Sequence, residues 1–172
     1  MAITTQGDSK FSEILSSLKS DGIPIDPIKV AREHGISVKN AKFYRDDISG
    51  MISKKDDEVL ILVNVDEPPY RKRFTIAHEL GHYFLHLDEQ NEFVDTSINL
   101  FRDSSNGEGG PVRAKEIEAN KFAAELLMPE SKVSALYKDV KSISDLARIF
   151  NVSEDAMSIR IARLGLEDEV LK

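Results

Sequence analysis

His78 and His82 are four positions apart, with Glu79 directly after the first, in the stretch Arg73–His82. On an α-helix this spacing places both imidazoles on one face, one turn apart, with a carboxylate at their side. Zinc peptidases use the H-E-x-x-H pattern to bind a metal ion and to activate water. A chain with this pattern must build a helix that is packed on one face and presents its histidines to a site on the other.

A helical projection of residues Tyr70 to about Leu87 supports such a helix. Its apolar residues gather on one side: Ile76, Ala77, Leu80, Tyr83, Phe84 and Leu87. His78 and His82 fall nearly opposite, with Glu79 flanking them, which suits one face to packing and the other to metal binding. The alternative is a solvated helix face that carries these residues by coincidence, because a bare H-E-x-x-H also occurs without a metal.

A zinc site on two histidines needs a third protein ligand, and the chain has no cysteine to supply one. The helix expected from Ala114 to Met128 offers carboxylates. On its projection Glu116 and Asn120 share the side of small residues, whereas Glu118 falls on the charged side. We therefore predict Glu116 as the third ligand and Asn120 as a hydrogen-bond partner of a ligand. Alternatively, Glu116 is a carboxylate stabilised by the helix macrodipole.

The remaining polar groups of the two helices receive distinct roles. Glu79 is predicted as the general base that takes a proton from water and passes it to the leaving amine. His86 lies one turn beyond His82 and is not expected to be a ligand, because one metal cannot easily span three successive turns. A supporting position beside the ligands or a polar helix end suits it better. Two imidazoles and one carboxylate favour Zn²⁺ and also admit Mn²⁺.

The order of elements predicts an α+β fold: a small antiparallel sheet packed with a zincin-type active-site helix and a second ligand helix, followed by helix-turn-helix-like helices. We expect a flexible tail over residues 1–9, a zincin-like metallopeptidase domain over 10–140 and C-terminal helices over 141–172, packed on the same domain. Strands are expected at Val38–Tyr44, Ile48–Ser53 and Val59–Val63, the last covered on both faces. Helices are expected at Lys10–Lys19, from Asp26-Pro27 to Gly35, and at 130–138, 142–150 and 153–164. The polar stretch 88–112 is expected to be a loop that could act as a lid.

Composition limits the classes of function. The formal net charge of −7 argues against nucleic acid as the main partner, because phosphate binding depends on basic surface. No apolar run is long enough to span a membrane, and the polar N-terminus lacks an apolar signal core. We therefore expect a cytoplasmic protein without a membrane anchor. The sequence leaves the oligomeric state open.

The segment Ser142–Leu166 resembles a helix-turn-helix, with Ser144 and Ser153 as candidate N-caps. A DNA-reading unit needs an excess of positive charge on its second helix. Here Arg160 and Arg163 are surrounded by acidic residues, so we expect the unit to pack on the core or to bind a protein partner.

The chain resembles the ImmA/IrrE family of metallopeptidases. The resemblance is carried by Arg73–His82 and Glu116–Pro129, covers roughly residues 26–165, and extends to Ser49-Gly50-Met51, the strand ending at Asn64 and Asp26-Pro27. It implies a gluzincin-like fold, metal ligands at His78, His82 and Glu116, and a glutamate base at Glu79. The chain ends soon after the last helices, so we expect no additional sensor domain of the kind some relatives carry.

The resemblance also implies a biological role. Family members are typically encoded by bacteria and mobile genetic elements and relieve repression by Cro/cI-type helix-turn-helix repressors, and some are paired with such a regulator in toxin–antitoxin-like operons. We therefore expect a zinc-dependent endopeptidase that acts as an anti-repressor by cutting such a protein. The alternative is a non-proteolytic, metal-stabilised protein that docks on a regulator.

Overall fold

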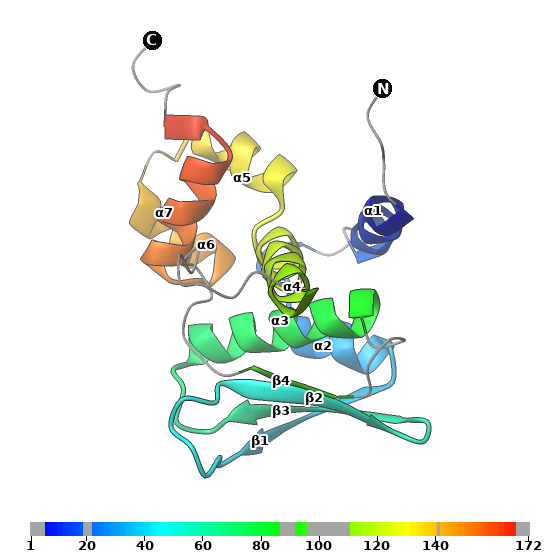
Figure 1. Ribbon diagram of the computed structural model, residues 1–172. Helices are drawn as coiled ribbons and strands as arrows, with labels where there is room; N and C mark the ends of the chain where they lie inside the picture. Colours follow the sequence, from blue (N-terminus) through cyan, green and yellow to red (C-terminus); the bar gives the residue numbers. More distant parts are fainter. Residues whose placement is uncertain (1–5, 19–21, 87–91, 96–110, 141, 168–172) are drawn as a thin grey trace.

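The computed structural model describes residues 6–18, 22–86, 92–95, 111–140 and 142–167, and these form an α+β fold. They contain seven helices and four strands (Figure 1). In chain order these are α1 (Gln6–Leu18), α2 (Pro27–Glu33), β1 (Ile36–Ala41), β2 (Gly50–Lys55), β3 (Glu58–Asn64), α3 (Pro69–His86), β4 (Glu92–Asp95), α4 (Pro111–Leu127), α5 (Glu130–Tyr137), α6 (Ile143–Phe150) and α7 (Glu154–Arg163). Among the described helices, none combines the length and apolarity needed to cross a bilayer.

The sheet is mixed, which corrects the expectation of an antiparallel one. Its strand order is β1-β3-β2-β4, and β1 runs parallel to β3, with Ile36 opposite Val59. β2 is antiparallel to both β3 and β4. Residues 42–49 connect β1 to β2, which are not adjacent in the sheet, and β3 lies between them. β1 and β2 run in opposite directions, so a strand between them that is antiparallel to β2 is parallel to β1. Local sequence patterns do not indicate which strands become neighbours.

β3 is central in the sheet, but the expectation that both of its faces are covered is wrong for the described residues. Ile61 and Val63 are buried beneath α3, whereas Leu60 and Leu62 on the other face are only half-buried. Figure 1 shows α2 and α3 on the same side of the sheet. The apolar run of β3 therefore packs against helices on one face of the sheet.

Several element boundaries also differ from the expected ones. β2 begins at Gly50 rather than Ile48, because Ile48 and Ser49 precede the strand in a buried segment bonded to Asn64. α1 begins at Gln6, so part of the proposed flexible tail is helical and residues 1–5 lie outside the described residues. Within the expected loop 88–112, β4 adds a strand to the sheet and α4 starts at Pro111; the rest of the proposed lid lies outside the described residues.

α3 forms the middle layer of the molecule. It lies on the sheet, and α4 crosses it on the side away from the sheet (Figure 1). Every residue from Phe74 to His82 is buried as a result. The same apolar core continues from Leu80 of α3 to Phe150 of α6 and Met157 of α7. The C-terminal helices therefore share the core of the molecule, while the boundary at residue 140 stays a prediction.

Candidate metal centre

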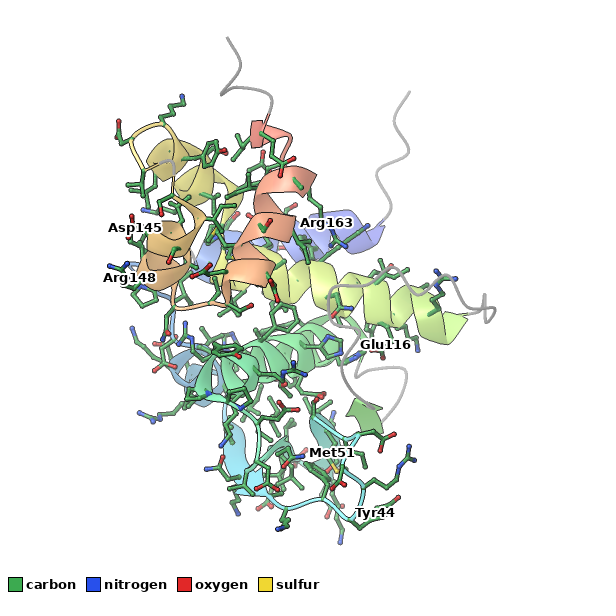
Figure 2. All side chains as sticks on the ribbon, turned by 90° about the vertical axis from the view of Figure 1, so that its left-hand side faces the viewer. Tyr44, Met51, Glu116, Asp145, Arg148 and Arg163 are labelled. Atoms are coloured by element: carbon green, nitrogen blue, oxygen red, sulfur yellow. The ribbon has the colours of Figure 1, made fainter. Side chains whose placement is uncertain are left out.

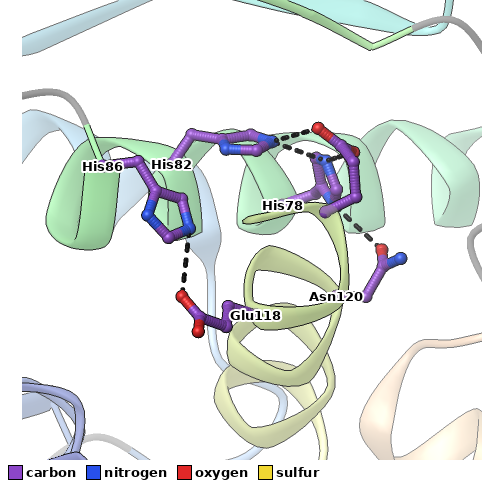
Figure 3. Close-up of polar contacts among 6 residues, drawn as sticks. His78, His82, His86, Glu118 and Asn120 are labelled. Carbon is purple, nitrogen blue, oxygen red and sulfur yellow. Dashed lines mark hydrogen bonds and ion pairs between the residues drawn. The ribbon is translucent and has the colours of Figure 1, made fainter. Parts of the chain in front are cut away.

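Three side chains from two helices converge where α3 and α4 cross (Figure 3). The Nε2 atoms of His78 and His82 lie 3.0 Å apart on α3. The two carboxylate oxygens of Glu116 on α4 lie 3.2 Å from these nitrogens, one from each. One ligand atom from each of the three residues falls within 4.8 Å of the others. Both histidines are buried and the Glu116 side chain is 38% exposed, so the cluster reaches solvent at the carboxylate.

Small residues allow the two helices to approach this closely. A Cβ atom added at Gly81 of α3 would lie 2.9 Å from Cα of Ala119 and 3.1 Å from its carbonyl oxygen. Ordinary carbon–carbon contacts are about 3.5 Å or longer, so only glycine fits here. Ala119 of α4 and Gly81 of α3 together permit the close contact. The crossing brings Glu116 within reach of the histidines.

Hydrogen bonding and burial set the protonation of the cluster. The Asn120 amide oxygen lies 2.9 Å from Nδ1 of His78 and can only accept, so Nδ1 carries the proton and Nε2 presents its lone pair. Burial lowers the pKa of His82, which favours neutral imidazole. Burial alone would raise the pKa of Glu116, but the contacts of its carboxylate oxygens with the ring nitrogens of His78 and His82 outweigh burial and hold that pKa well below its ordinary value. Neutral imidazoles and a carboxylate are the forms that bind metals.

The cluster fits a divalent metal ion. Two nitrogens bound to one tetrahedral zinc ion at about 2.05 Å lie roughly 3.3 Å apart, and the two Nε2 atoms are already 3.0 Å apart. Two imidazoles and one carboxylate leave the fourth tetrahedral position open, as in catalytic zinc sites. Imidazole and carboxylate donors suit manganese as well, so the site does not by itself identify the metal.

Glu79 and His86 flank this cluster on α3. Glu79 is fully buried, and its Oε1 faces β2, where a Cβ atom added at Gly50 would lie 3.4 Å from it. The ring of His86 packs beside that of His82, with 5.5 Å between the ring centroids. Its Nε2 lies 3.6 Å from Oε2 of Glu118, the carboxylate predicted to point away from the metal ligands. His86 is thus outside the three-residue cluster.

The helix-turn-helix-like segment is attached to α3 and α4 by two arginines. Arg160 of α7 donates to the Met128 carbonyl oxygen at 3.0 Å and pairs with the carboxylate of Glu125 at the end of α4. Arg73 of α3 donates to the carbonyl oxygen of Asn151, between α6 and α7. One of the two arginines considered for DNA reading is therefore held against α4, while Arg163 is exposed (Figure 2).

Sequence reasoning missed the glycines that shape the site. Gly81 lies inside a helix, where glycine is about 1 kcal/mol less favourable than alanine, and Gly50 begins a strand, where glycine also weakens the element. Each is a signal of close backbone approach that could have been used. Neither glycine by itself indicates which residue it contacts.

A mixed sheet under a helix with two histidines, crossed by a helix that supplies a glutamate, is the arrangement of a metallopeptidase domain. A family profile described as the IrrE N-terminal-like domain, of a peptidase family, matches residues 31–162, and the chain belongs to this family. The resemblance seen in the sequence is thereby confirmed.

Two known proteins are similar to the chain. Metallopeptidase ImmA of Bacillus subtilis (strain 168) is 26% identical over 106 residues, which span 60% of this chain and 57% of ImmA. A solved Mycobacterium tuberculosis transcriptional regulator is similar in structure, with a TM-score of 0.60, 20% identity and coverage of 91% of this chain and 46% of the regulator. The matched regions are thus about half the length of both relatives, and the likeness to the regulator shows the fold alone.

Proposed function

We propose that the chain is a zinc-dependent endopeptidase that cuts a helix-turn-helix repressor of the Cro/cI type and so relieves repression. The observation that carries the proposal is the convergence of His78, His82 and Glu116, with Glu79 next in sequence to the first ligand. Membership of a peptidase family supports the reaction type. The choice of substrate is supported by the resemblance to the ImmA/IrrE family.

In this proposal the protein groups have separate tasks. His78, His82 and Glu116 hold the ion, and Asn120 fixes the orientation and tautomer of His78 through its amide oxygen. A divalent ion held by these residues would supply Lewis-acid chemistry, which would polarise a peptide carbonyl group and lower the pKa of water. Glu79 accepts the proton of the attacking water and delivers it to the leaving amine, so that one carboxylate acts first as base and then as acid.

His86 has a supporting role in the same proposal. Its ring packs against that of His82, and its Nε2 faces the Glu118 carboxylate. These contacts restrict movement of the His82 ring on the side that faces away from His78. We assign it no direct contact with the ion, because it lies outside the cluster of three.

The decisive experiment compares the wild-type chain with Glu79→Gln. Both are loaded with zinc and incubated with a Cro/cI-type helix-turn-helix repressor, and products are identified by mass spectrometry. The glutamine variant should retain zinc and lose cleavage by several orders of magnitude, because the amide cannot accept the proton. If the wild-type chain and the Glu79→Gln variant both relieve repression without cleavage, the chain is instead a docking protein.

A second experiment identifies the metal. We expect the purified chain to contain about one zinc ion per molecule by elemental analysis, and His78→Ala to lose it. Manganese in place of zinc would keep the ligands and change the metal in the proposal. Retention of stoichiometric metal by the alanine variant would show that the ion is bound elsewhere.

A further inference from the structure

The first residue of β2 forms a contact with α3 beside the metal cluster. Gly50 is buried, and a Cβ atom added there would overlap Cγ2 of Thr75 and lie 3.4 Å from Oε1 of Glu79. The same atom would lie 3.0 Å from the carbonyl oxygen of Leu62. Thr75 and Glu79 are one turn apart on one face of α3, so both rest on the same point of the strand. A methyl group at position 50 would therefore overlap Thr75 and come into van der Waals contact with the Glu79 carboxylate.

This part of the strand is held from several directions. Gly50 pairs with β3 on one side and with β4 on the other. The residues before it are bonded to Asn64, whose Nδ2 donates to the Ile48 carbonyl oxygen at 2.8 Å and whose backbone N–H donates to that of Ser49 at 2.9 Å. The Ser49 hydroxyl also donates to Glu67 at 3.0 Å. A backbone anchored in this way cannot retreat easily, so strain introduced at Gly50 is transmitted to α3.

We propose that Gly50 and Thr75 are positioning residues for Glu79. The strand backbone acts as a fixed support, the Thr75 methyl group sets the distance between support and helix, and the Glu79 carboxylate is held at that distance beside the metal ligands. A side chain at position 50 must push Thr75 away by roughly 1 Å to reach an ordinary carbon–carbon contact. The inference rests on the proposed function in one respect, the assignment of Glu79 as the base.

The support can be tested without any assay of activity. Glutamate labelled with ¹³C at the carboxyl carbon reports the surroundings of Glu79 by NMR, and the signal is assigned by its loss in Glu79→Gln. Gly50→Ala should shift this signal, in the metal-free and the zinc-loaded chain. Gly22→Ala is the matched control, because an added Cβ atom there meets nothing within 4 Å. An unchanged Glu79 signal in Gly50→Ala would overturn the proposal.

The partner of the contact is tested by a second substitution. Thr75→Ser removes Cγ2, the atom that the new Cβ would overlap, and keeps the hydroxyl group. In Gly50→Ala/Thr75→Ser the Glu79 signal should therefore return most of the way to its position in Thr75→Ser, with a remainder caused by the Leu62 carbonyl contact. If Gly50→Ala fails to fold, recovery of folding in the double variant is the expected result. A double variant as perturbed as Gly50→Ala would refute the role of Thr75.

Kinetics then connect position to catalysis, with the repressor as substrate. Gly50→Ala should lower kcat by about 100-fold, the usual effect of a 1 Å misplacement, with KM and zinc affinity within about threefold of wild type. The double variant should recover at least about tenfold of this loss. A loss of kcat that Thr75→Ser does not reverse would contradict the proposal. If the wild-type chain cuts no repressor, the proposed function fails; if Glu79→Gln keeps full cleavage, only the assignment of Glu79 as the base fails. In either case the NMR result still decides whether Gly50 and Thr75 position Glu79.

Discussion

The contact between Gly81 of α3 and Ala119 of α4 gives a quantitative prediction for Gly81→Ala. The new Cβ atom would lie 2.9 Å from Cα of Ala119 and 3.2 Å from Cβ of Phe122. To restore a contact of about 3.5 Å, α3 and α4 must separate by roughly 0.6 Å. Metal–ligand distances tolerate only about ±0.2 Å. Since Glu116 lies on α4 and both histidines lie on α3, the substitution should separate the carboxylate from its two partners.

The expected loss falls mainly on metal binding. Overpacking costs about 1–3 kcal/mol, and replacing a helical glycine by alanine returns about 1 kcal/mol, so the metal-free chain should lose about 1 kcal/mol of stability. For a chain of this size that corresponds to a Tm lower by roughly 3 °C. The zinc affinity should fall about 10–100-fold, as when the support of a ligand is removed. No side chain at position 119 can relieve the contact, because it involves backbone atoms.

The assay is competition for zinc against a chromophoric chelator, with thermal unfolding of the metal-free chain measured in parallel. Glu116→Ala gives the reference for loss of a ligand, and Gly22→Ala is the control for a glycine-to-alanine change in open space. A Gly81→Ala chain that folds and binds zinc within about threefold of wild type would refute the reasoning, because α3 and α4 would then separate without moving the ligands.

Four further outcomes follow from the structure. The Thr75 hydroxyl is buried without a hydrogen-bond partner among the described residues, so Thr75→Val should raise the free energy of unfolding by about 1 kcal/mol in denaturant titrations; a decrease would reveal a bound partner. Asn120→Ala should lower zinc affinity about 10–100-fold, and an unchanged affinity would show that His78 needs no support. Arg160→Ala removes the ion-pair partner of Glu125 and should destabilise the chain by about 2 kcal/mol, whereas exposed Arg163→Ala should stay within about 0.5 kcal/mol; equal effects would contradict the α7–α4 contact. Zinc at 100 times its Kd should stabilise the chain by about 2.7 kcal/mol, and His78→Ala or a chelator should abolish this gain; a gain that persists would place the ion at another site.

Helical periodicity made much of the site predictable. The positions of His78 and His82 on one face, and the choice of Glu116 over Glu118, follow from a repeat of 3.6 residues that holds wherever the helix lies. The structure brings the three predicted ligands together, and Glu118 is 57% exposed at the edge. Their role as ligands stays a prediction until metal binding is measured.

The sheet was less predictable, because strand neighbours are decided by long-range pairing. The residues of β1 have the same local pattern whether the strand lies beside β2 or, as observed, beside β3 in parallel. β4 is four residues long and sits in a polar stretch, so its pattern is too short to distinguish from a loop. Its pairing with β2 became visible only in the folded chain.

The sequence alone therefore indicated which residues form the two helices of the candidate site, which of their faces carry the predicted ligands, and which family the chain resembles. The helices and their faces depend on residues close together in the chain. The tertiary structure alone decided how near the ligands come, through Gly81 against Ala119, and what supports Glu79, through Gly50 against Thr75. These distances arise between segments far apart in sequence, and a contact between two backbones has no pattern in either segment by itself.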